Sequence, residues 1–177
     1  FNNLGLIIID EEQRFGVMQK EKLKMKWPGT DILTLSATPI PRTLHMAMIG
    51  IRDMSVLSAP PSDRHPVQTY VLEYNEAVVK NAIERELARG GQVYFLHNNI
   101  DSLYKIASKL SELLPDIRID VAHGQMDEYS LSVAWDKLIN KDTDVLVCTT
   151  IIETGIDVPN VNTIIINNAD MLGLAQL

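Results

Sequence analysis

The chain has 177 residues, of which 46% are hydrophobic, and a formal net charge of −7 at pH 7. This length can bury one large core or two small ones, and the acidic balance argues against a protein that holds nucleic acid by bulk charge. No apolar run approaches the ~20 residues that span a bilayer, and no charged-then-apolar signal segment opens the chain. We therefore expect a cytoplasmic protein with no membrane partner.

The first predicted element is a strand that ends on acidic residues. Leu4 to Ile9 holds five apolar side chains and one glycine, which is typical of a central parallel strand covered on both faces. Ligands of such sheets bind at the carboxyl ends of the strands, where Asp10 and Glu11 emerge. Asp10 can hold Mg²⁺ through water, and Glu11 can orient and deprotonate a water that attacks a phosphate. A strand running into a solvated acidic turn is the alternative.

A helix and a second strand follow. Val17 to Trp27 is predicted as a short surface helix, because a Pro-Gly pair follows it. The aliphatic strand from Ile32 to Leu35 leads to Ser36-Ala37-Thr38. Small hydroxyl residues at a strand end can hydrogen-bond both a neighbouring acid and the next loop, although a simple capped turn explains them as well. Asp53 to Leu57 is a candidate edge strand.

A proline-rich stretch, SAPPSDRHP at residues 58–66, indicates a linker, because it lacks apolar periodicity. We divide the chain into a first segment of residues 1–58, a linker of residues 59–66 and a second segment of residues 67–177. The first segment is too short for a whole domain of this kind. It is expected to be the carboxyl-terminal half of one, and the second segment is expected to be nearly whole.

Strands alternate with helices in the second segment. The predicted strands are 67–73, 92–96, 117–122, 144–148 and 161–166, and the predicted helices are 75–89, 101–114 and 127–140. Helices of this length between strands indicate βαβ units and a parallel sheet. The predicted fold class is therefore α/β, with parallel sheets and flanking helices.

Polar clusters follow three of these strands. They are His97-Asn98-Asn99, His123-Gly124-Gln125, and Thr149-Thr150 with Glu153, Gly155 and Asp157. The carboxyl ends of parallel strands share one edge of a sheet, so the clusters are expected to lie together. Amides, hydroxyls and glycines suit a phosphate backbone, which is bound by hydrogen-bond donors and closely approaching main chain. Taken singly, each residue is equally well explained by helix capping and turns.

Together these motifs resemble one family. DEEQ and SATP are similar to motifs II and III of the superfamily 2 helicases and translocases. The longer blocks DEEQRFG, LSATPIPRTLHMAMIGIRD, GGQVYFLHN, AHGQM and VLVCTTIIETGIDVPNVNTIII resemble the bacterial transcription-repair coupling factors, with the RecG branch-migrating helicases as nearest relatives. The resemblance covers nearly all of the chain, with its blocks in the family's order.

The resemblance implies the carboxyl-terminal part of one RecA-like domain and most of a second. The parent would be an ATP-dependent double-stranded DNA translocase that uses ATP and Mg²⁺, removes stalled RNA polymerase at lesions, and meets RNA polymerase and excision-repair proteins through other domains. For catalysis the resemblance implies Asp10 as the Mg²⁺ residue, Glu11 as the base and Gln13 as a γ-phosphate sensor. It implies coupling residues Ser36, Thr38 and Arg42, DNA contacts Asn98, His123, Gly124, Thr149 and Thr150, and nucleotide-cleft residues Glu153, Gly155 and Asp157.

The phosphate-binding loop G-x-x-x-x-G-K-[ST] does not occur in this sequence, since none of its nine glycines precedes a lysine. In the resembled family, the arginines that reach the γ-phosphate follow the run that ends here at Leu177. We therefore expect the 177 residues alone to show no ATPase or motor activity. Two alternatives stay open: a RecG-type helicase, for which DEQH is expected in place of DEEQ, and a non-catalytic RecA-like binding module. Asn99 and Asp127–Ser130 depart from the family pattern.

Overall fold

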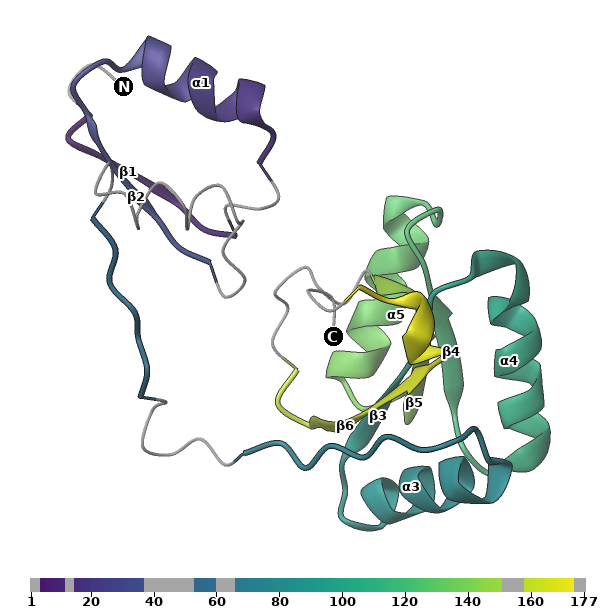
Figure 1. The fold of residues 1–177 in the computed structure, drawn as a ribbon. Coiled ribbons are helices and arrows are strands. Elements are labelled where there is room, and N and C mark those ends of the chain that lie inside the picture. The colour runs from purple at the N-terminus through teal and green to yellow at the C-terminus, as the bar shows by residue number, and fades with distance from the viewer. Residues whose placement is uncertain (1–3, 12–14, 37–52, 60–65, 151–157, 174–177) are drawn as a thin grey trace. The chain divides into compact units, whose positions relative to one another are not determined.

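The computed structural model describes residues 4–11, 15–36, 53–59, 66–150 and 158–173 (Figure 1). The chain divides into two compact units, Phe1–Gln68 and Thr69–Leu177. Each unit is described by itself. Gln13, Thr38 and Arg42 of the first unit lie outside the described residues, as do Glu153, Gly155 and Asp157 of the second.

The first unit contains a two-stranded parallel sheet. Strand β1 (Leu6–Ile9) pairs with β2 (Asp31–Thr34), so that Ile9 lies opposite Thr34. Helix α1 (Val17–Lys26) lies between them in the sequence, at the place where a helix was predicted. Parallel strands cannot be joined by a tight turn, and a crossover of this kind is the usual connection.

The prediction that β1 is covered on both faces is wrong. Leu6 and Ile8 are 50% and 59% exposed, and Ile9 is the buried residue of the strand. Helix α1 buries none of its residues, so it supplies no covering layer. A run of aliphatic residues indicates a tendency to be buried, but burial requires a second layer to pack against.

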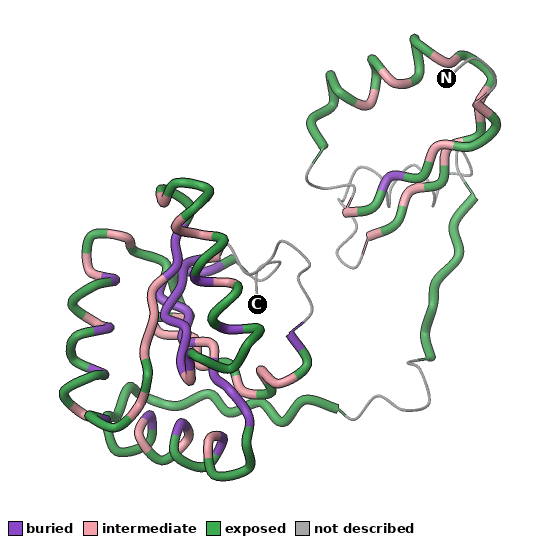
Figure 2. Tube along the Cα trace, turned by 180° about the vertical axis from the view of Figure 1, so that it is seen from behind, coloured by how far each residue is buried: buried purple, intermediate pink, exposed green. Residues whose placement is uncertain are grey.

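Two further predicted strands are absent from the described residues. Residues 53–57 and 67–73 form no strand, and Leu57 and Val71 are 96% and 95% exposed. Figure 2 shows the second of these segments as an exposed run leading into α3 (Glu76–Ala88). The residue types in both segments favour strands, but a strand is stabilised by pairing and by contacts with its neighbours rather than by composition alone.

The second unit is a parallel sheet between two layers of helices (Figure 1). The strand order is β4-β5-β3-β6, with every pair parallel. The strands are β3 (Gln92–His97), β4 (Ile119–Ala122), β5 (Val145–Cys148) and β6 (Val161–Asn167); the helices are α3, α4 (Ile100–Leu113) and α5 (Glu128–Ile139), and a 3-10 turn, η3, spans Ala169–Met171. The predicted α/β fold class is confirmed.

Alternate residues of the central strands enter two separate cores. Val93 and Phe95 of β3 pack with residues of α3 and α4, whereas Leu96 packs with residues of α5. The strand period of two places successive side chains on opposite faces. Both faces of β5 are covered, and all four of its residues are buried, which explains its uninterrupted apolar sequence. Figure 2 shows the buried positions gathered on these central strands.

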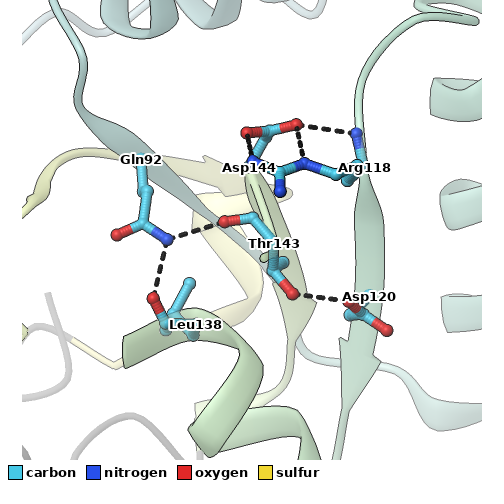
Figure 3. A network of polar contacts seen from close by, with 6 residues as sticks. All are labelled: Gln92, Arg118, Asp120, Leu138, Thr143 and Asp144. Atoms are coloured by element: carbon cyan, nitrogen blue, oxygen red, sulfur yellow. Dashed lines mark hydrogen bonds and ion pairs between the residues drawn. The ribbon is translucent and has the colours of Figure 1, made fainter. Parts of the chain in front are cut away.

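The amino-terminal edge of this sheet is held by polar contacts (Figure 3). The side-chain amide of Gln92, the first residue of β3, donates to the carbonyls of Leu138 and Thr143 at 2.8 and 2.6 Å. Arg118 precedes β4 and forms a two-pronged pair with Asp144, which precedes β5, with N···O distances of 3.0 and 2.7 Å. These contacts tie three strand starts and the end of α5 together at the amino-terminal ends of the strands.

The ion pairs at this edge predict a loss of stability in acid. Burial by itself raises the pKa of the Asp144 carboxyl, but the Arg118 hydrogen bonds and charge outweigh burial and hold that pKa below its ordinary range. The ionised Asp144 contributes fully to the stability of the fold above the pKa that this carboxyl has in the unfolded chain. That contribution is lost as the pH falls through the lower pKa of Asp144 in the folded state. We expect the melting temperature to fall as the pH drops below about 4. Asp144→Asn should flatten that dependence in thermal melts; an unchanged slope would contradict it.

Candidate functional site

The acidic turn after β1 has an unusual backbone. The Asp10 Oδ1 atom accepts the N–H of Glu11 at 2.8 Å, and Glu11 adopts a φ of 51°. This left-handed conformation is uncommon for a residue with a long side chain, and such residues cluster at functional sites. Because Ile9 pairs with Thr34, Glu11 and Ser36 each lie two residues beyond a paired position. The register therefore brings the acids and the first hydroxyl of the predicted coupling motif to the same strand ends.

These acids suit a cation that arrives with a phosphate ligand. Among the described residues, three or more His, Cys, Asp or Glu side chains nowhere gather in a metal-binding cluster. Protein sites for Mg²⁺ usually supply one or two carboxylates and leave the other positions to water and substrate phosphates. Asp10 is exposed, and its Oδ1 accepts the Glu11 amide. The pair thus fits Mg²⁺, and the assignment of Asp10 to that ion stays a prediction.

An open hollow lies at the carboxyl edge of the second sheet. Its lining consists of Asn98, Asn99, Ile100, Asp101, Gly124, Gln125, Thr149 and Thr150. These residues follow β3, β4 and β5, and the parallel order of these strands brings their ends side by side. The hollow therefore unites four of the five residues predicted to contact DNA. The described residues of its lining offer amides, hydroxyls and one carboxylate, and they include no Lys or Arg.

The fifth predicted residue, His123, stands behind this lining. It is 7% exposed, its Nδ1 accepts the Gln125 N–H at 3.3 Å, and its Nε2 lies 3.0 Å from the Tyr104 hydroxyl. Both ring nitrogens are thus engaged within the protein. The His123 carbonyl also accepts the Met126 N–H at 3.1 Å, which closes the turn that carries Gly124 and Gln125. A direct contact between this ring and DNA stays a prediction.

His97 has a structural role at the same strand ends. The sequence pattern grouped it with Asn98 and Asn99 and did not predict this role. Its Nε2 lies 2.7 Å from the Ser102 hydroxyl and its Nδ1 lies 3.1 Å from the Asn167 side-chain nitrogen. Burial lowers the pKa of this imidazole and favours the neutral ring. His97 therefore joins the end of β3 to the first turn of α4 and to the end of β6. Its position at a strand end is the sequence signal. Ser102 is five residues away, but Asn167 is 70 residues away, and only the fold brings it to His97.

Two departures from the expected motif pattern have a simple local role. The Asn99 side chain accepts the Ser102 N–H at 3.2 Å, and the Asp127 side chain accepts the Ser130 N–H at 2.9 Å. They are the N-caps of α4 and α5. Each satisfies a backbone donor that the helix cannot satisfy internally. Both departures therefore preserve the elements that position the hollow.

The model of the helicase conserved C-terminal domain matches residues 74–176. The chain belongs to this helicase family. A transcription-repair-coupling factor of Bacillus subtilis (strain 168) is 58% identical over 177 residues, which are 100% of this chain and 15% of that protein. The transcription-repair-coupling factor of Staphylococcus aureus (strain USA300) is 56% identical over 177 residues, which are again 100% of this chain and 15% of that protein. The chain thus spans about 15% of the length of these relatives.

A solved structure of RecG bound to a three-way DNA junction also resembles this helicase-family chain. The TM-score is 0.71 and the sequence identity 36%, covering 99% of this chain and 23% of RecG. The predicted resemblance to coupling factors and RecG is confirmed, and with it the RecA-like α/β fold class. Within the described residues, no helix combines the length and apolarity that a membrane crossing requires.

Proposed function

We propose that this chain is the central part of the motor of an ATP-dependent double-stranded DNA translocase, which removes stalled RNA polymerase at lesions and couples transcription to nucleotide excision repair. The 58% identity to a coupling factor over all 177 residues carries this proposal. In this view residues 1–58 and 67–177 belong to two RecA-like motor domains joined by residues 59–66. RNA polymerase and the repair proteins bind other parts of the longer polypeptide.

In the first unit, the acidic turn carries the hydrolytic chemistry. Asp10 holds Mg²⁺ through water, and Glu11 orients the attacking water and accepts its proton; both roles are supported by the position of these acids at the end of a parallel strand. When bound beside Asp10, Mg²⁺ would supply positive charge to the phosphates. Gln13 senses the γ-phosphate, and Ser36, Thr38 and Arg42 transmit nucleotide state. Glu153, Gly155 and Asp157 contribute to nucleotide binding.

In the second unit, the hollow holds one strand of the duplex by its phosphates. Asn98, Gly124, Thr149 and Thr150 are the residues proposed to make this contact. Neutral donors and a glycine can track a phosphate backbone without reading base sequence, as a translocase requires. Contacts made by these neutral residues also release few counterions, so they accord with the acidic net charge of the chain.

The DNA grip is tested by Asn98→Ala combined with Thr150→Ala in the complete polypeptide that contains these residues. We expect the affinity for duplex DNA to fall about tenfold for each contact removed, because each substitution takes away a hydrogen bond to a charged phosphate. Fluorescence anisotropy with labelled duplex DNA measures this affinity. Asn140→Ala is the matched control, because Asn140 is exposed and ends α5, away from the hollow. An unchanged affinity in the double variant would refute the grip at this hollow.

A RecG-type fork helicase is the second candidate, favoured by the 36% identity to RecG over 99% of the chain. The two candidates differ in the substrate that the complete polypeptide remodels. A coupling factor dissociates a stalled transcription complex, whereas a fork helicase regresses a model fork. A non-catalytic module would do neither and would hydrolyse no ATP.

A further inference from the structure

Tyr104 lies on α4, outside the set of residues that line the hollow. It lies one turn after Ile100, which lines the hollow, and it is 55% exposed. Its ring meets that of His123 edge to face, with the centroids 5.7 Å apart and the planes at 85°. His123 leads directly into the lining residues Gly124 and Gln125. The tyrosine ring therefore stands next to two segments of the wall and is held by a buried neighbour.

The hydrogen bonds of His123 determine what the tyrosine hydroxyl can do. The Nδ1 atom accepts the Gln125 N–H, so it carries no proton, and the ring proton is on Nε2. Nε2–H then donates to the Tyr104 oxygen at 3.0 Å. A hydroxyl oxygen that accepts a hydrogen bond keeps its own proton available for donation. In the described part of the chain this hydroxyl has no second partner.

We propose that Tyr104 is a further phosphate-binding residue of this hollow, and that His123 is a positioning residue which orients it. The Tyr104 O–H donates to a phosphate oxygen of the DNA strand, while the imidazole holds the phenol oxygen in place. This inference rests on the proposed function, and it assigns His123 an indirect role in the contact. A tyrosine side chain has few rotatable bonds, so holding its hydroxyl in place costs little entropy.

The chemistry of the wall favours a neutral donor at this point. Asp101 carries the only charge among those lining residues that the structure describes, and a carboxylate repels phosphate. Asp101 also lies in the first turn of α4, where a negative charge is stabilised by the helix. A hydroxyl one turn further along the helix supplies a hydrogen-bond donor without adding a cation.

Tyr104→Phe in the complete polypeptide tests the contact, because it removes the hydroxyl and keeps the ring. We expect duplex DNA affinity to fall about fivefold to tenfold. We also expect an unchanged slope of affinity against salt, since a neutral contact releases no counterion. Tyr74→Phe is the control: Tyr74 is 50% exposed and its ring lies under Lys109, away from the hollow lining. Equal affinities of Tyr104→Phe and the unaltered protein would overturn the proposal.

A double-mutant cycle tests the positioning role. His123→Gln alone should weaken DNA binding, whereas in the Tyr104→Phe background it should weaken binding much less, because the histidine acts through the hydroxyl. If the losses of DNA-binding free energy in the two single variants add up to the loss in the double variant, the positioning role of His123 is refuted. The Asn98 and Thr150 variants separate the two proposals. If they weaken binding and Tyr104→Phe does not, only the tyrosine contact fails; if no variant has an effect, the proposed DNA grip fails as well.

Discussion

Glu11→Gln is expected to reduce ATP hydrolysis by the complete polypeptide roughly 10²- to 10⁴-fold while leaving ATP binding intact, because the proposed general base is lost. Glutamine keeps the length and shape of the side chain, but its amide cannot accept a proton from the attacking water. Glu11 sits in the left-handed turn that the Asp10 carboxylate stabilises, and that contact uses its backbone N–H. The substitution therefore changes the chemistry and leaves the backbone contact in place.

Single-turnover hydrolysis and the binding of a fluorescent ATP analogue measure the two properties separately. Glu21→Gln is the control, since Glu21 is exposed on α1 in the same unit. Near-normal hydrolysis by Glu11→Gln would remove Glu11 from the role of base. Loss of ATP binding together with hydrolysis would point instead to a structural role for the acidic turn.

Alanine at Gly91 is expected to lower the free energy of unfolding of the second unit by about 2 kcal/mol, because a buried carboxylate must give up its partners. An added Cβ would lie 1.7 Å from Glu86 Oε1 and 2.7 Å from its Cδ. Glu86 is 2% exposed, its carboxylate pairs with Arg89, and it accepts the hydroxyl of Thr163. Burial by itself raises the Glu86 pKa, but these hydrogen bonds outweigh it and lower the pKa, so the group that must move is ionised.

Urea unfolding of the 177-residue chain, followed by circular dichroism, measures this cost. A double-mutant cycle that combines Gly91→Ala with Glu86→Ala identifies the cause of the lost stability, since substitutions of residues in contact have non-additive effects. Once the carboxylate is gone, Gly91→Ala should cost little further stability. A cost that persists in the Glu86→Ala background would show that the backbone at Gly91 is responsible, and the carboxylate clash would be rejected.

The sequence by itself determined the main elements of the second unit and the edge that carries the hollow. Helices α3, α4 and α5 show apolar residues at helical spacing, and β5 and the interior of β3 consist largely of hydrophobic residues because helices cover both sheet faces. Regular βαβ alternation implies a parallel sheet, which places successive strand ends together. The meeting of Asn98, Gly124 and Thr149 therefore followed from order along the chain, without knowledge of any contact.

Only the tertiary structure decided which residues become partners and which apolar runs are buried. Leu6 and Val71 belong to runs with strand-like composition, yet both are exposed, because burial depends on a neighbouring layer that composition does not specify. Tyr104 and His123 are 19 residues apart, and their pairing depends on how α4 lies beside the end of β4. Periodicity reports which face of an element is apolar, whereas distances between side chains of different elements arise from packing in three dimensions.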